Sequence, residues 1–314
     1  LEAIMRDAEF ARQWRSSFKV DDKCHRKSYA LLARNPRQFC IIPVRLGMLS
    51  SPGTKQLTET KLMRVREGVE VAGVSDVGCQ RANNEDSYGY WEPASDSEYE
   101  QKGRLAIVAD GMGGHEGGQE ASSLAVQTIQ ESYAEASAAD PQSLLIAAFH
   151  AAHERIHRFA LEHPNLRGMG TTATAIALLS KQLCYCHVGD SRLYLVRGGK
   201  ASRLTHDHSY VNRLVDSGVI TPEEAEVHPQ RHILTTALGV GPEFSPDASA
   251  QPISLEPGDV LVLCTDGLWG LVADQEIANV VSGSAPAEAC RALVELAKQR
   301  GGSDNITLQV LRVD

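Results

Sequence analysis

The sequence predicts an α+β fold in which two mainly antiparallel β-sheets are covered by helices. Three observations lead to this prediction. Short apolar runs bounded by Gly or Asp recur along the chain, as in buried strands. These runs flank blocks of paired helical patterns, without the regular alternation of a doubly wound sheet. The chain has 314 residues, 42% of them hydrophobic, which is enough for one large domain with an ample core.

The first half of the body is predicted from periodicity and from helix ends. Residues 69–74 alternate apolar and polar side chains as a half-buried strand, and residues 105–109 are a continuous apolar run. Residues 118–136 place small apolar side chains at helical spacing, which favours close packing. Pro141 stands in the first turn of another helix, which extends to about Glu162 and ends at the following His-Pro.

The second half contains more strands and two further helices. Strand-like runs cover residues 171–179, 183–188, 192–196, 260–264 and 306–313. Gly198-Gly199 marks a hairpin turn. The polar stretch 206–239 contains a short helix, indicated by Thr221 as a capping residue with glutamates in the first turn. Helical patterns return at 274–281 and 286–299.

Aspartates follow several of these apolar runs. Asp110, Asp190 and Asp266 each end one, and Asp304 lies just before the last. Carboxylates at strand ends lie on the rim of a sheet, where residues far apart in sequence converge. Crowded carboxylates raise one another's pKa unless a cation holds them, and hard divalent ions prefer oxygen ligands. The sequence therefore predicts an oxygen-ligated metal site.

Charge divides the chain in two. Residues 1–68 carry 14 Lys and Arg against 7 Asp and Glu, whereas residues 69–314 carry 17 against 33, a net charge of −16 within the −9 of the chain. Residues 48–60 are polar and turn-rich, as in a linker. We expect residues 1–68 to be a poorly ordered basic extension, part of it non-native or an over-long start before Met63.

Composition also argues against several classes of protein. No uninterrupted apolar stretch approaches the roughly 20 residues of a membrane span, and the first residues lack the apolar core of a secretory signal. The seven cysteines lack the spacing of a disulfide framework, which indicates reduced thiols and a cytoplasmic location. Cys184 and Cys186 are expected to be buried neighbours on one strand face. The acidic body argues against binding of nucleic acid.

Arg81 lies five residues before Asp86, in a loop after the first strand. A guanidinium binds phosphate oxygens bidentately, although a surface ion pair with Glu85 or Asp86 explains this arginine better when it is taken alone. The surrounding motifs reverse that preference. In chain order they are Arg81-x-x-Asn-Glu-Asp86, Asp110-Gly-Met-Gly-Gly-His115, Gly170-Thr-Thr172, Val188-Gly-Asp190-Ser-Arg, Thr265-Asp266-Gly and Ser303-Asp304-Asn305.

This ordered set strongly resembles the type 2C family of metal-dependent Ser/Thr protein phosphatases, in a bacterial-type variant with Met after the first Asp-Gly. The resemblance covers about residues 69–313. It implies a β-sandwich flanked by pairs of helices, in α-β-β-α layers, and a catalytic domain over residues 69–314. Two divalent ions, Mn²⁺ or Mg²⁺, would lie at one end of the sandwich.

The resemblance assigns the acidic motif residues to metal binding. Asp110 would bridge both ions, and the Gly111 carbonyl would bind the second. Asp266 and Asp304 would complete the ligands of the first ion.

Three further positions would act around these two ions. Asp86, helped in some relatives by Glu85, would serve the second ion directly or through water. Asp190 would bind a weaker third ion. Arg81 would bind the substrate phosphate and, with Asp110, would be one of the two catalytic residues.

The implied activity is hydrolysis of phosphoserine and phosphothreonine on proteins by a metal-activated water, opposing a bacterial Ser/Thr kinase, in a monomer. Two alternatives stay open: a phosphatase of an anti-sigma-factor antagonist, and a catalytically inactive phosphoprotein-binding module. Met112 stands where many eukaryotic relatives carry a histidine proposed as general acid, and methionine cannot donate a proton. Residues 206–239 correspond to a variable flap, which we expect to be mobile and to influence which phosphoprotein fits.

Overall fold

The computed structural model of the protein describes residues 61–62, 66–137, 140–241 and 244–314. These residues belong to a unit of residues 56–314, whereas the other unit, residues 1–55, lies outside the described residues. The predicted linker and most of the predicted basic extension lie outside them as well. No helix in the described part of the chain is long and apolar enough to cross a membrane.

One six-stranded sheet contains both ends of the described chain. Its strand order is β1-β2-β13-β12-β8-β9, and all neighbours are antiparallel. The strands are β1 (Lys61–Leu62), β2 (Val69–Asp76), β13 (Ile306–Val313), β12 (Val260–Cys264), β8 (Arg192–Arg197) and β9 (Lys200–Arg203). The predicted Gly198-Gly199 turn joins β8 to β9, with φ of 58° and 76°, values that favour glycine.

The second sheet carries most of the predicted site. Its main path is β10-β7-β6-β4-β3, with β11 beside β7 and β5 beside the end of β4, again antiparallel throughout the described strands. The strands are β3 (Asp86–Trp91), β4 (Arg104–Met112), β5 (Gly170–Thr171), β6 (Ala173–Leu179), β7 (Gln182–Val188), β10 (Asp247–Ala248) and β11 (Ile253–Ser254).

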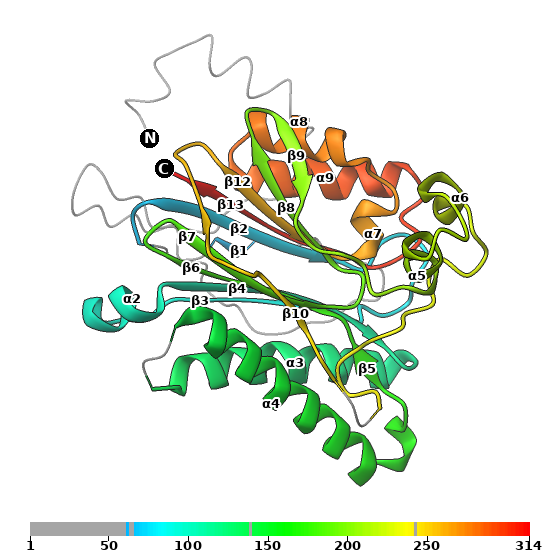
Figure 1. Ribbon diagram of the computed structural model, residues 1–314. Helices are drawn as coiled ribbons and strands as arrows, with labels where there is room; N and C mark the ends of the chain where they lie inside the picture. The colour runs from blue at the N-terminus through cyan, green and yellow to red at the C-terminus, as the bar shows by residue number, and fades with distance from the viewer. Residues whose placement is uncertain (1–60, 63–65, 138–139, 242–243) are drawn as a thin grey trace, which may run out of the picture. The chain divides into compact units, whose positions relative to one another are not determined.

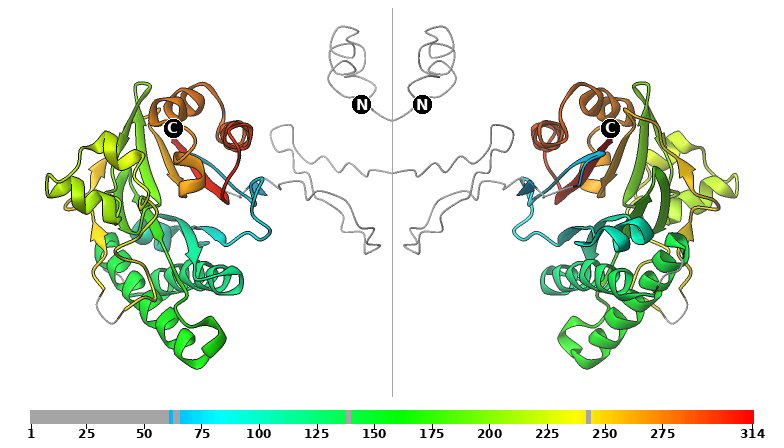
Figure 2. Two further views of the ribbon diagram at one scale, coloured as in Figure 1. Left: turned by 90° about the vertical axis from the view of Figure 1, so that its right-hand side faces the viewer. Right: turned by 90° about the vertical axis from the view of Figure 1, so that its left-hand side faces the viewer.

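Pairs of helices cover the outer faces of the two sheets (Figure 1). They are α3 (His115–Glu135) with α4 (Pro141–Glu162) on one side, and α8 (Asp274–Gly283) with α9 (Pro286–Gln299) on the other. In Figure 2 the green pair and the orange pair lie on opposite sides of the strands. This confirms the predicted α-β-β-α layers. The shorter helices are α2 (Asp96–Lys102), η1 (Pro164–Leu166), α5 (Tyr210–Asp216), α6 (Pro222–Glu226) and α7 (Asp266–Trp269).

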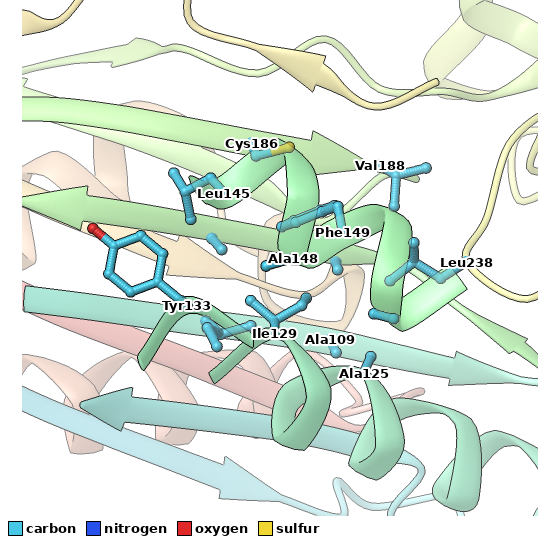
Figure 3. Packing of buried hydrophobic residues seen from close by; sticks show 14 of the residues in the cluster. Ala109, Ala125, Ile129, Tyr133, Leu145, Ala148, Phe149, Cys186, Val188 and Leu238 are labelled. Carbon is cyan, nitrogen blue, oxygen red and sulfur yellow. The ribbon is translucent and has the colours of Figure 1, made fainter. Parts of the chain in front are cut away.

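Three buried apolar clusters hold these layers together. Under α3 and α4, Ile129, Tyr133 and Phe149 pack on the second sheet around Cys186 and Val188 (Figure 3). A second cluster lies between the sheets, and a third lies under α8 and α9. Cys184 and Cys186 both belong to the first cluster, which confirms that they are buried neighbours on one strand face.

The predicted elements agree best where the local pattern is strongest. The strands at 260–264 and 306–313 and the helices at 141–162 and 286–299 have the predicted bounds. The strand β3 was missed, because its sequence, Asp-Ser-Tyr-Gly-Tyr-Trp, contains no apolar run. As the last strand on its side of the sheet, β3 leaves most side chains half-buried.

Candidate active site

Two aspartates meet across neighbouring strands at one end of the second sheet. Asp86 begins β3 and pairs in register with Asp110, near the end of β4. Directly opposed residues place their side chains on the same face of a sheet, about 5 Å apart at Cβ. Thr265, the residue before Asp266, donates its hydroxyl to Asp86 Oδ2 at 2.9 Å. Strand pairing and this hydrogen bond therefore bring three of the predicted residues to one place.

The electrostatics of these aspartates show that they repel one another. Burial raises the pKa of Asp86 to about 7, against the effect of hydrogen bonds from Thr307 and Thr265. Burial and then the charges of neighbouring aspartates raise the pKa of Asp110 well above its usual value. The pKa of Asp190 is raised in the same way, with Asp266 as the largest charged contributor after burial. Such a group of carboxylates is favourable only with compensating positive charge.

The donor atoms suit a hard divalent cation. The buried Oδ1 of Asp266 has no hydrogen-bond partner among the described residues, and buried acceptors are rarely left so. Carboxylate oxygens are the ligands that Mg²⁺ and Mn²⁺ prefer. As they stand, no three His, Cys, Asp or Glu side chains in the described ranges are gathered closely enough to hold an ion.

Arg81 lies at the rim of this group. Its side chain is 46% exposed, and one of its terminal nitrogens donates to Asp304 Oδ2 at 2.6 Å. The sequence favoured Glu85 or Asp86 as the partner of a surface arginine, whereas the structure pairs Arg81 with another of the predicted metal-binding residues. A guanidinium at this position is available to an anion that approaches the aspartates from solvent.

Asn305 fixes the loop that carries Arg81 and Glu85. Its Oδ1 accepts the backbone N–H of Glu85 at 2.8 Å, and its Nδ2 donates to the carbonyls of Val77 and Asn83 at 3.0 Å each. The three contacts tie the loop to the start of the C-terminal strand.

Glycines let the segment after β4 approach the same loop. A Cβ on Gly111 would lie 2.0 Å from the Gly118 carbonyl oxygen, and one on Gly118 would lie 2.0 Å from Glu85 Oε2. No side chain fits at Gly111, where the contacts are with backbone, and a side chain at Gly118 would displace the Glu85 carboxylate. The backbone of Gly111, next to Asp110 in the chain, therefore lies against Glu85 and donates its N–H to the Glu85 carbonyl at 3.2 Å.

Two threonines that the sequence offered only as a motif hold the backbone of Asp110. The Asp110 carbonyl accepts the N–H of Thr172 at 2.9 Å and the hydroxyl of Thr171 at 2.8 Å. The Asp110 N–H donates to Thr172 Oγ1 at 3.0 Å, and this oxygen lies 2.7 Å from Ser191 Oγ. Thr172 thus connects Asp110 to the residue after Asp190. The available signal was a pair of polar side chains at the start of a buried strand.

Asp190 lies in the turn between β7 and β8, beside a cleft of about 850 Å³. The cleft lies between the flap, residues 206–239 with α5 and α6, and the chain around α7 and the start of α8. His206 lies 3.0 Å from Asp216 and His208 lies 3.1 Å from Asp247, so each histidine pairs outside the group of predicted ligands. His232, which the sequence did not single out, lies 3.8 Å from Asp266 Oδ2.

Comparisons with known proteins agree with this geometry. A family model described as Protein phosphatase 2C matches residues 80–297. Protein phosphatase PhpP of Streptococcus pneumoniae is 36% identical over 251 residues, covering 78% of this chain and 98% of PhpP. The crystal structure of the Mycobacterium tuberculosis phosphatase PstP/Ppp is 38% identical, with a TM-score of 0.70 over 79% of this chain and 99% of that one.

A second structure of a relative bears on the metal site. The catalytic domain of PstP, solved in complex with two manganese ions, is 37% identical with a TM-score of 0.68, over 79% of this chain and 99% of that one. The match to the family model and the extent of these similarities lead to one conclusion: the chain belongs to the protein phosphatase 2C family and is a serine/threonine protein phosphatase.

Proposed function

We propose that the protein releases phosphate from phosphoserine and phosphothreonine side chains with the help of two divalent ions bound at the aspartate group. The observation that carries this proposal is the group itself: buried aspartates that raise one another's pKa, one of them with an unpartnered oxygen, beside an exposed arginine. Buried carboxylates that repel one another destabilise the fold, and a bound cation offsets this cost, so such a group indicates a cation-binding site.

The ligand roles follow the family resemblance. Asp110 would serve both ions, and the Gly111 carbonyl would serve the second. Asp266 and Asp304 would complete the ligands of the first ion. The unpartnered Oδ1 of Asp266 supports its role, because a cation would satisfy it.

Asp86 would serve the second ion, and Glu85 would act beside it. The position of Asp86 opposite Asp110 supports this assignment, since one ion can then contact both carboxylates. Asp190 binds a third, weaker ion, supported by the influence of Asp266 on its pKa.

Bound divalent ions supply the positive charge that activates a water and stabilises negative charge on the phosphoryl group. The chain's own residues bind and orient. Arg81 takes two phosphate oxygens with its guanidinium, and for this it leaves its ion pair with Asp304. The threonine hydrogen bonds hold Asp110 in place during turnover. Met112 has no proton to give, so the leaving oxygen takes its proton from another donor.

The substrates are phosphoproteins, and we propose that the enzyme opposes a bacterial Ser/Thr kinase and acts as a monomer. The named relatives, PhpP and PstP, are bacterial phosphatases, which supports a bacterial signalling role. A cytoplasmic location stays a prediction. It agrees with the free thiols of Cys79, Cys184, Cys186, Cys264 and Cys290.

The test is phosphate release from a phosphothreonine peptide by the full chain, first with Mn²⁺ and then with excess EDTA. We expect release that needs Mn²⁺ and stops with EDTA. Asp110→Asn, which keeps the size of the side chain and removes its charge, serves as the matched inactive variant. Release that continues in EDTA, or that Asp110→Asn leaves intact, contradicts the proposed site.

A further inference from the structure

The helix α7 contacts the site at both of its ends. Its first residue is Asp266, and its last is Trp269, whose indole Nε1–H donates to the backbone carbonyl of Asp190 at 2.9 Å. A helix of four residues makes about one turn, so its two ends lie close together. The hydrogen bond therefore sets where the turn that carries Asp190 lies relative to Asp266.

Arg192 holds the indole ring in this orientation. The centre of its guanidinium lies 3.6 Å from the centroid of the Trp269 ring, in the range of a close cation–π contact. Its Nε lies 3.1 Å from Asp207 Oδ1, and its terminal nitrogen lies 2.7 Å from Asp207 Oδ2. The side chains of Arg192 and Asp207 are largely buried, with 14% and 6% of their surface exposed. A forked, buried ion pair of this kind has one favourable orientation.

Asp207 also holds the first part of the flap. Its backbone carbonyl accepts Nδ2 of Asn212 in α5 at 3.0 Å. Ser209, two residues further on, caps the same helix through the N–H of Asn212. The carboxylate of Asp207 thus orients Arg192, while its backbone anchors α5.

We propose that Trp269 is a positioning residue for Asp190, and that the Arg192–Asp207 ion pair keeps Trp269 in place and joins the flap to the same unit. This inference rests on the proposed function, because Asp190 matters only if the aspartates bind metal ions. It goes beyond that function because it assigns the positioning of Asp190 to Trp269, Arg192 and Asp207, which are not among the proposed metal or phosphate ligands. Movement of α5 would reach Asp190 through Asp207, Arg192 and Trp269.

The strand β8 offers a matched control at its other end. Arg197 forms the same kind of fork with Asp259, at 2.8 and 2.6 Å, and Asp259 is 2% exposed. No contact of that pair leads to the aspartate group within the described residues. Effects of Arg192 that Arg197 does not share therefore report on the site rather than on the strand.

The first experiment is a double-mutant cycle in the full chain, with a small aryl phosphate as substrate and MnCl₂ as the only metal. Trp269→Phe keeps an aromatic ring under Arg192 and removes the N–H that holds Asp190. We expect kcat to fall about 3- to 10-fold, the value of one hydrogen bond, and KM to change little. In an Asp190→Asn background the same substitution should cause no further loss, because the group through which it acts has been altered.

The second experiment measures metal binding directly by calorimetric titration of Mn²⁺ into metal-free protein. Trp269→Phe and Arg192→Lys should weaken the weakest binding step about 3- to 10-fold, whereas Arg197→Lys should leave every step unchanged. Lysine keeps the charge of arginine and loses the planar fork. Arg192→Lys carries the test if Trp269→Phe does not fold, as judged by its melting curve.

The outcomes separate this inference from the proposed function. Wild-type protein without Mn²⁺-dependent turnover refutes the proposed function. If the wild-type protein is active and Trp269→Phe lowers kcat equally in the wild-type and Asp190→Asn backgrounds, the positioning role is overturned. Unchanged Mn²⁺ affinities in Trp269→Phe and Arg192→Lys overturn it as well. The positioning role is also overturned if Arg197→Lys weakens Mn²⁺ binding as much as Arg192→Lys does, because the loss would then come from a general disturbance of β8.

Discussion

Replacement of Thr172 by valine tests how the structure holds Asp110. The side chain is 2% exposed, and its hydroxyl accepts the N–H of Asp110 at 3.0 Å and lies 2.7 Å from Ser191 Oγ. Valine has nearly the same shape and no hydroxyl. The substitution therefore leaves a buried N–H and a buried hydroxyl without this partner, and changes the packing little.

The size of the effect follows from these two groups. A buried polar group left without a partner costs about 1–3 kcal/mol, so Thr172→Val should lower the free energy of unfolding by about 2–6 kcal/mol. Native domains have about 5–15 kcal/mol in total, so the variant should lose a large part of its stability. Thr172→Ser is the control: it keeps the hydroxyl and loses one methyl group, worth about 1 kcal/mol.

The assay is urea unfolding of wild type and both variants in EDTA, because bound metal would add its own stabilisation. Turnover of an aryl phosphate at saturating Mn²⁺ is measured in parallel. We expect Thr172→Val to be the less stable variant and to lose more of kcat, since Asp110 is then held by fewer hydrogen bonds. Equal unfolding free energies for the valine and serine variants would refute the reasoning, because the hydroxyl would then contribute no more than one methyl group, about 1 kcal/mol.

Three further predictions concern the site and the extension. Asp266→Asn should abolish turnover and raise the melting temperature in EDTA by about 2–4 °C for each kcal/mol of repulsion removed, and a lower melting temperature in calorimetry would contradict mutual repulsion. Arg81→Ala should raise KM for a phosphopeptide about 10-fold or more, as expected for a charged hydrogen bond; Arg81→Lys should recover only part of this, and an unchanged KM counts against phosphate binding. Removal of residues 1–60 should leave kcat/KM for an aryl phosphate within about twofold, in line with a catalytic domain at 69–314. An inactive truncated protein would show that the extension is part of the catalytic fold.

Local patterns predicted the layers of the fold and the strands that carry the aspartates. The run at 260–264 and the helix at 141–162 were recognised with their final bounds, because each has a strong apolar pattern and clear ends. Asp110 and Asp266 were singled out because each follows such a run. The order of the motifs then indicated the family, which the comparisons show.

The contacts that organise the site depend on pairing between distant segments. Asp86 lies opposite Asp110 only through the register of β3 on β4, and β3 has no apolar run of its own. Arg81 pairs with Asp304 although 223 residues separate the two in the sequence. Thr172 was recognised only as part of a motif, and Trp269 gave no signal of its task, because neither residue type indicates which distant backbone group it contacts. The sequence by itself determined which chemistry is present, because local spacing shows where strands end. Only the tertiary structure decided which side chains meet, because strand register and helix packing are settled by the whole core at once.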